Sequence, residues 1–82
     1  MEEKLVIRGV YQHYKNPEHI YVVLNISLSS ETTEELVTYE QLYTGSEFKT
    51  GTLWTRPKKM FLENIVVDGN EVPRFKYLKI IL

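Results

Sequence analysis

Residues 20–28 read IYVVLNISL, and this stretch decides the fold class. Apolar side chains stand at every second position, at Ile20, Val22, Leu24, Ile26 and Leu28. Side chains of a β-strand alternate between its two faces, so this spacing is typical of a strand with one buried face. We therefore predict a strand over residues 20–28 whose apolar face points into the core.

The segments on either side of this strand indicate further short strands separated by turns. Strand character is found over residues 10–15, 36–43, 52–56 and 75–82, and over residues 65–67 and 71–72 around a hairpin signal at Asp68-Gly69-Asn70. Pro57 favours one short helical turn through Phe61, because proline is tolerated at the first helical position. About six strands with turn signals at short, regular spacing predict a small barrel or sandwich.

The composition agrees with an all-β fold. Val, Ile, Thr, Tyr, Phe and Trp supply 31 of the 82 residues, and alanine is absent. A chain of this length corresponds to one domain over residues 1–82. The lack of cysteine excludes disulfides and thiolate metal sites, so the core alone must stabilise the fold.

Several function classes are disfavoured by what the sequence lacks. No stretch approaches the ~20 apolar residues of a membrane span, and the charged start of the chain does not resemble a secretory signal. We therefore expect a cytoplasmic protein that does not enter a membrane. The two histidines, His13 and His19, show no metal-ligand spacing, so we expect no metal and no cofactor.

Charge is unevenly distributed along the chain, although the net charge is only −1. Residues 27–48 contain five Glu and no Lys or Arg, whereas residues 49–82 contain seven basic and three acidic residues. This difference indicates an acidic edge and a basic edge, unless each is simply a solvated face.

Six short motifs, in order along the chain, resemble a small bacterial family, domain-of-unknown-function family 1653. They are Gly9-x-Tyr11-x-His13-Tyr14-Lys15, Tyr21-x-Val23, Ser30-Glu31-Thr32-x-Glu34, Val37-x-Tyr39-x-x-Leu42-Tyr43, Leu53-Trp54-x-Arg56-Pro57-x-x-Met60-Phe61-x-Glu63 and Val72-Pro73-Arg74-Phe75. The resemblance covers about residues 9–75. It implies an SH3-like β-barrel and no established activity. The family often has a histidine just before the Ser-Glu-Thr motif, where this chain has Ser29.

Eight residues are candidates for a binding surface on such a barrel. They are Tyr11, His13, Glu31, Tyr39, Tyr43, Trp54, Arg56 and Arg74. Flat aromatic rings can stack on a ligand, and an arginine offers a planar fork of donors for a carboxylate or phosphate. In the other interpretation, the aromatic residues pack in the core and Arg56 pairs with Glu31 or Glu63.

These candidates lead to a principal hypothesis and two alternatives. The principal one is a non-catalytic module that presents an aromatic and basic groove to a peptide or protein partner. On the same face, single-stranded nucleic acid could stack on the rings while Arg56, Lys58, Lys59 and Arg74 meet its phosphates. A small enzyme or enzyme accessory would use His13, Glu31 and Arg56, although so small a barrel has little volume in which to desolvate catalytic groups.

The last predicted strand is a further candidate interface. This apolar strand would be an exposed edge with unpaired backbone groups unless it closes the barrel or pairs with a second copy of the chain. A homodimer through this strand is therefore an additional expectation.

Overall fold

A computed structural model describes residues 5–81 as an almost entirely β protein. The elements in this part of the chain are β1 (Gly9–His13), β2 (Ile20–Leu28), β3 (Glu35–Gln41), β4 (Leu53–Pro57), α1 (Lys58–Phe61), β5 (Asn64–Val67), β6 (Asn70–Pro73) and β7 (Phe75–Ile80). The predicted all-β class is confirmed, as are the strand over residues 20–28 and the helical turn that follows Pro57. Residues 5–81 include no helix with the length and apolar character required to span a membrane.

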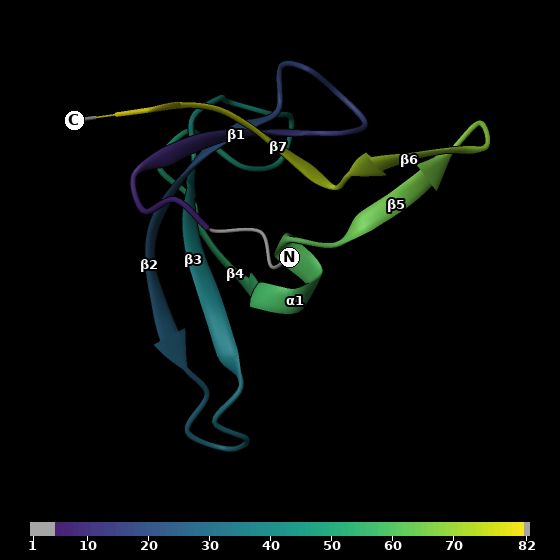
Figure 1. Ribbon diagram of the computed structural model, residues 1–82. Helices are drawn as coiled ribbons and strands as arrows, with labels where there is room; N and C mark the ends of the chain where they lie inside the picture. The colour runs from purple at the N-terminus through teal and green to yellow at the C-terminus, as the bar shows by residue number, and fades with distance from the viewer. Residues whose placement is uncertain (1–4, 82) are drawn as a thin grey trace.

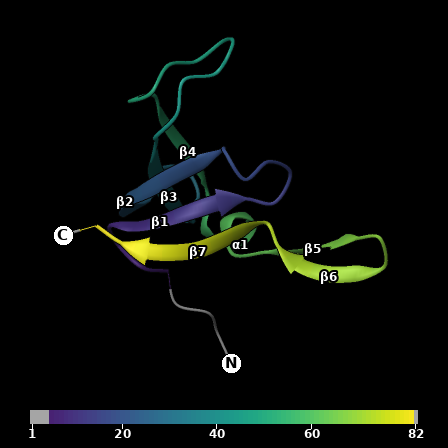
Figure 2. The same cartoon turned by 90° about the horizontal axis from the view of Figure 1, so that it is seen from above.

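Five strands form one antiparallel sheet in the order β4-β3-β2-β1-β7, and β5 pairs with β6 in a separate hairpin. The hairpin extends away from the sheet, and α1 lies between the two (Figure 1 and Figure 2). In the described part of the chain β4 and β7 are the two edges of the sheet, so the barrel implied by the resemblance is not closed. The C-terminal strand pairs with β1 and leaves its other side as an edge.

The core lies between the sheet and α1. Its buried side chains are Tyr11, Val23, Val37, Tyr39, Phe61 and Phe75. The rings of Phe61, from α1, and Phe75, from β7, are stacked with centroids 4.2 Å apart and an interplanar angle of 4°. Because Pro57 ends β4 and the chain turns at once into α1, Phe61 is carried under the sheet, where its ring packs against Tyr11, Tyr39 and Phe75.

A β-bulge changes which residues of β2 face the core. The register with β3 shifts between Val23 and Asn25, so two residues of β2 stand where a regular strand would have one. Val23 rather than Leu24 is buried in the core, and Leu28 at the end of the strand is 64% exposed. The predicted apolar face is therefore wrong for Ile20 and Val22, before the bulge, whereas Ile26 beyond the bulge lies opposite the core residue Val37 as predicted; the strand itself was placed correctly.

The β5–β6 hairpin turns at Asp68 and Gly69, which both have positive φ, at 50° and 79°. Positive φ at both central residues matches the twist of a tight two-residue hairpin, and Asp-Gly is a preferred pair there. At the base of the hairpin the Arg74 amide donates a hydrogen bond of 2.9 Å to the Glu63 carbonyl. This backbone contact brings the start of β7 back to the end of α1.

Candidate binding site

A pocket of about 250 Å³ lies where side chains of the edge strands β4 and β7 meet. Its lining consists of His13, Lys15, His19, Tyr21, Tyr39, Trp54, Arg56 and Phe75. We call this the Arg56 pocket. Because the sheet is open between β4 and β7, side chains rather than backbone hydrogen bonds span the gap, and they leave room for a ligand.

Strand register brings the aromatic wall of the pocket together. Tyr39 is directly opposite Val23 on one side and Trp54 on the other, while Tyr21 is opposite Gln41. Residues directly opposite each other share a face of the sheet. The edge of the Tyr21 ring meets Tyr39 at 5.2 Å between centroids, so adjacent strands supply a continuous aromatic surface.

The turn between β1 and β2 places both histidines at one end of the pocket. Asn16 accepts the amide hydrogen of Glu18 on its side-chain oxygen at 2.9 Å, and Pro17 fixes the turn between them. The turn closes with a hydrogen bond of 2.9 Å from the His13 amide to the His19 carbonyl. The His13 ring then lies edge-to-face against Phe75, with centroids 5.1 Å apart.

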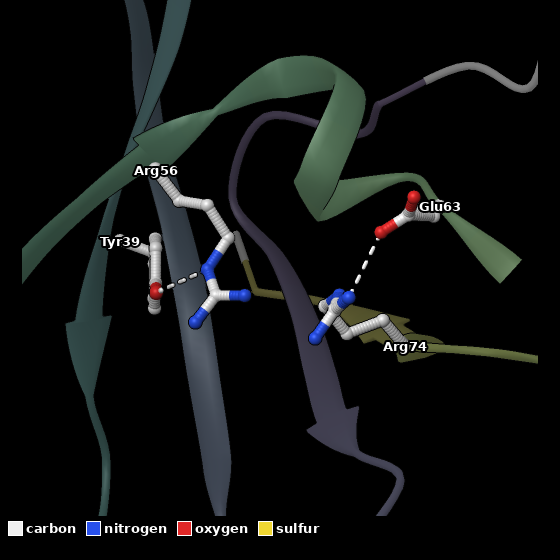
Figure 3. Close-up of polar contacts among 4 residues, drawn as sticks. All are labelled: Tyr39, Arg56, Glu63 and Arg74. Atoms are coloured by element: carbon white, nitrogen blue, oxygen red, sulfur yellow. Dashed lines mark hydrogen bonds and ion pairs between the residues drawn. The ribbon is translucent and has the colours of Figure 1, made fainter. Parts of the chain in front are cut away.

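Arg56 is the principal charge of the pocket. Its Nε donates a hydrogen bond of 3.3 Å to the Tyr39 hydroxyl (Figure 3). Its guanidinium carbon lies 5.4 Å from the centre of the Phe75 ring. In the described part of the chain the pocket lining includes no acidic residue. The guanidinium is therefore oriented by neutral aromatic groups and is not neutralised by a carboxylate.

His13 is neutral at physiological pH. Burial, followed by the positive charges of Arg56, Arg74, His19 and Lys15, lowers the pKa of His13 from 6.5 to about 4. Its Nδ1 accepts the Lys15 amide hydrogen at 3.3 Å. His13 therefore contributes a polar, uncharged wall.

The hydroxyl of Tyr21 also stays protonated. Burial, and then the hydrogen bond of 3.0 Å between the hydroxyls of Tyr21 and Tyr43, raises the pKa of Tyr21 above its ordinary value. The pocket surface near this phenol is thus neutral as well.

A second pocket of about 330 Å³ adjoins the first, because His19 and Trp54 line both. Its other lining residues are Gln41, Tyr43, Gly45, Ser46, Glu47 and Phe48. The His19 and Tyr43 rings are stacked at 4.4 Å, and the Phe48 ring meets Trp54 edge-on at 4.9 Å. We call this the Trp54 pocket, and the two pockets together the groove.

Gln41 holds the Trp54 pocket in place. Gln41 is only 2% exposed, yet both polar atoms of its side chain form hydrogen bonds. The amide nitrogen donates to the Tyr43 and Phe48 carbonyls at 2.8 and 2.9 Å, and the amide oxygen accepts the Trp54 indole hydrogen at 3.0 Å. A buried amide with every partner in place fixes its surroundings, so this one residue ties the loop after β3 to the indole of β4.

Four of the eight candidate residues, His13, Tyr39, Trp54 and Arg56, line the Arg56 pocket. Tyr43 lines the Trp54 pocket. Tyr11 belongs to the core, with its ring edge-on to Phe61 at 5.2 Å. The structure thus combines both interpretations of the aromatic residues, since Tyr11 is core, Tyr43 and Trp54 line the groove, and Tyr39 does both.

Arg74 and Glu31 do not line the groove. Arg74 forms an ion pair of 2.8 Å with Glu63 at the base of the β5–β6 hairpin. Glu31 is exposed in the turn after β2, and its amide donates to the Ser29 hydroxyl. His13 lies beside the beginning of β2, whose nine residues span roughly 26 Å at ~3.3 Å per residue, so Glu31 lies at the opposite end of that strand.

Nine residues that line the groove were not among the candidates: Lys15, His19, Tyr21, Gln41, Gly45, Ser46, Glu47, Phe48 and Phe75. The spacing of His19 and Tyr21, two apart at the start of a strand, is a signal that they share a face with Val23. No local signal marks Phe48, because it reaches Trp54 from a loop.

The family described as "Protein of unknown function (DUF1653)" matches residues 9–77 of the chain. A crystal structure of a DUF1653 protein from Bordetella bronchiseptica is similar to this fold, with a TM-score of 0.74 and 29% sequence identity. The similarity covers 92% of this chain and 90% of that one. No curated protein matches the chain.

Proposed function

The chain belongs to the DUF1653 family, whose function is unknown, and we propose that it is a non-catalytic module whose groove binds a peptide segment of a partner protein. The observation that carries this proposal is the pair of adjoining open pockets that share His19 and Trp54. Aromatic side chains with one or two polar anchors are typical of peptide-binding surfaces. The cytoplasmic location expected from the sequence is part of the same proposal.

An enzymatic function has weaker support. The three residues that would carry it are His13, Glu31 and Arg56. Glu31 lies in the turn after β2, at the far end of that strand from His13, and it does not line the pocket that His13 and Arg56 share. A general base also needs a partner that orients it, and the Nδ1 of His13 is occupied by the Lys15 amide instead of a carboxylate.

Single-stranded nucleic acid has weaker support for a different reason. Two of the four cations that would meet phosphates are already paired, Lys58 with Glu35 at 3.5 Å and Arg74 with Glu63 at 2.8 Å. A binding groove for single strands needs a track of unpaired positive charge beside its stacking rings. We keep nucleic acid as an outcome of the test.

The test is a selection from a random peptide library displayed on phage, with the full chain as bait. The strongest selected peptide is then added to ¹⁵N-labelled protein and followed by NMR. We expect enrichment, with the largest shifts at the Trp54 indole and at backbone amides around the groove. Absence of enrichment, or shifts confined to another surface, would contradict the proposal.

Oligothymidylate of ten nucleotides is titrated in parallel at low and moderate salt. Shifts at the groove that fade as salt rises would indicate phosphate contacts and favour the nucleic-acid alternative over the peptide. An Asn70→Ser variant, altered at the tip of the β5–β6 hairpin, is the matched control and should bind like the wild type.

A further inference from the structure

We infer that the groove recognises an acidic side chain, with a carboxylate of the peptide bound by Arg56 and a neighbouring aromatic or large apolar side chain in the Trp54 pocket. This inference rests on the peptide-binding function proposed above and specifies its ligand. The site needs no conformational change, since both pockets are open in the structure.

Arg56 retains hydrogen-bond donors that a ligand can use. Its Nε is engaged by the Tyr39 hydroxyl, while in residues 5–81 no protein acceptor binds its two terminal nitrogens. A guanidinium binds a carboxylate most strongly through two parallel hydrogen bonds. Because Tyr39 and the Phe75 ring hold the guanidinium, little side-chain freedom is lost when a carboxylate arrives.

The Arg56 pocket carries positive charge. The cations that line the Arg56 pocket are Arg56 and Lys15, and within residues 5–81 its lining includes no carboxylate. Positive charge without a counter-charge in a partly dehydrated aromatic pocket favours an anionic ligand. Charge complementarity therefore selects an acidic residue over a neutral one.

Each of the two pockets has a size that suits one side chain. At about 250 Å³ the Arg56 pocket lies below the ~300–1,000 Å³ that drug-sized ligands occupy, and it suits one side chain. The Trp54 pocket, on the other side of the shared His19 and Trp54, offers Phe48 and Tyr43 as apolar walls. Two adjoining pockets of this size fit two side chains of one extended segment.

The test compares the peptides selected by the wild-type chain with those selected by Arg56→Met. We expect the wild type to enrich peptides with Asp or Glu near an aromatic residue, and Arg56→Met to retain the aromatic preference while losing the acidic one. The strongest peptide is then resynthesised with Gln for Glu or Asn for Asp. Its affinity should fall by about tenfold or more, the size expected for lost charge-assisted hydrogen bonds.

Two further variants keep this test interpretable. Arg56→Lys retains the charge but not the planar fork of donors. Its affinity for the acidic peptide should therefore lie between that of the wild type and that of Arg56→Met. Lys58→Met removes one positive charge outside the groove and should leave the affinity unchanged. Circular dichroism confirms that each variant is folded before binding is measured.

The outcomes separate the two proposals. If the amide-substituted peptide binds as tightly as the acidic one, or if Arg56→Met selects the same acidic peptides, the carboxylate inference fails while peptide binding stands. If no peptide is enriched by any variant, the proposed function itself fails. Loss of acidic preference in Arg56→Met together with normal binding by Lys58→Met would support the inference.

Discussion

Arg56 and Arg74 both lie near His13, and they differ in the groups that surround their guanidinium charges (Figure 3). Both lie near enough to His13 to lower its pKa. Arg74 faces a carboxylate, with its Nη2 2.8 Å from Glu63, whereas Arg56 faces the Tyr39 hydroxyl and the Phe75 ring. One arginine is neutralised within the fold, and the other is held in place with its charge available.

The difference follows from where each residue stands in the fold. Arg74 follows β6 and Glu63 precedes β5, so closure of the hairpin brings their side chains together. Arg56 stands on an edge strand opposite Val37, and its neighbours on that face are aromatic. A cation that closes a hairpin stabilises structure, while a cation supported by neutral rings at an open edge is suited to bind a ligand.

The largest expected effect on stability comes from removing the Phe75 ring, which supports Arg56 but not Arg74. Phe75→Ala deletes one ring that makes two contacts: it lies beneath the Arg56 guanidinium, and it is stacked on Phe61 in the core. We expect the free energy of unfolding to fall by about 3–5 kcal/mol, as for other buried phenylalanines. Urea denaturation measures this loss.

Tyr77→Ala is the matched control, because Tyr77 is an exposed ring on the same strand. Its loss of stability should be clearly smaller. Equal losses for the two variants would mean that Phe75 is not the common support of Arg56 and the core.

An intermediate effect is expected from His13, whose charged form is opposed by both arginines. Its folded pKa of about 4 lies below the ordinary 6.5, so the unfolded chain binds the proton first as pH falls. Stability should therefore be lost as pH falls from about 6.5 towards 4. We expect a loss of about 1–2 kcal/mol, because solvent screens this partly exposed site.

Denaturation at several pH values measures this loss, with His13→Gln as the test variant. The variant should lack the part of the pH dependence that His13 causes, while His19→Gln should keep it. Identical pH profiles for the wild type and His13→Gln would show that burial and the charges of Arg56 and Arg74 do not oppose protonation of His13.

The smallest expected effect comes from breaking the Arg74 ion pair. Glu63→Gln removes the counter-charge of Arg74 at a half-exposed position, so the free energy of unfolding should fall by about 0.2–1 kcal/mol. The loss should shrink as salt rises, because salt screens exposed charges. Peptide affinity should stay the same, since neither partner of this ion pair lines the groove.

Thermal or urea denaturation of Glu63→Gln at two salt concentrations tests this expectation. Glu18→Gln, at a glutamate that has no ion pair within the described residues, should cost less. A drop in peptide affinity for Glu63→Gln would show that Arg74 contributes to the groove and would remove the contrast between the two arginines.

Most of the fold could be read from local pattern. Alternation placed β2 over residues 20–28, and the Asp-Gly turn placed the β5–β6 hairpin. Period-two reasoning failed at the bulge after Val23, because one extra residue exchanges the two faces of the strand. Val23 is on the core side before the bulge, and Ile26, opposite the core residue Val37, is on the core side after it. Nothing in residues 20–28 signals the bulge, since apolar side chains continue on both sides of it.

The candidate site was predictable in part. Spacing put Trp54 and Arg56 on one face, and the structure confirms that both line the Arg56 pocket. Spacing did not separate Tyr11, which is in the core, from Tyr43, which is in the groove. Exposure of a ring depends on what lies across from it, and Phe61 of α1 reaches Tyr11 from fifty residues away.

The sequence by itself determined the β class, the strand positions and the turns, because alternation, proline and Asp-Gly act over a few neighbouring residues. Only the tertiary structure decided that the sheet stays open between β4 and β7, and that Glu63 pairs with Arg74 instead of Arg56. Electrostatic pairing depends on distances between side chains that the folded backbone brings together, and those distances are absent from local sequence. The available charge of Arg56 is therefore a property of the fold.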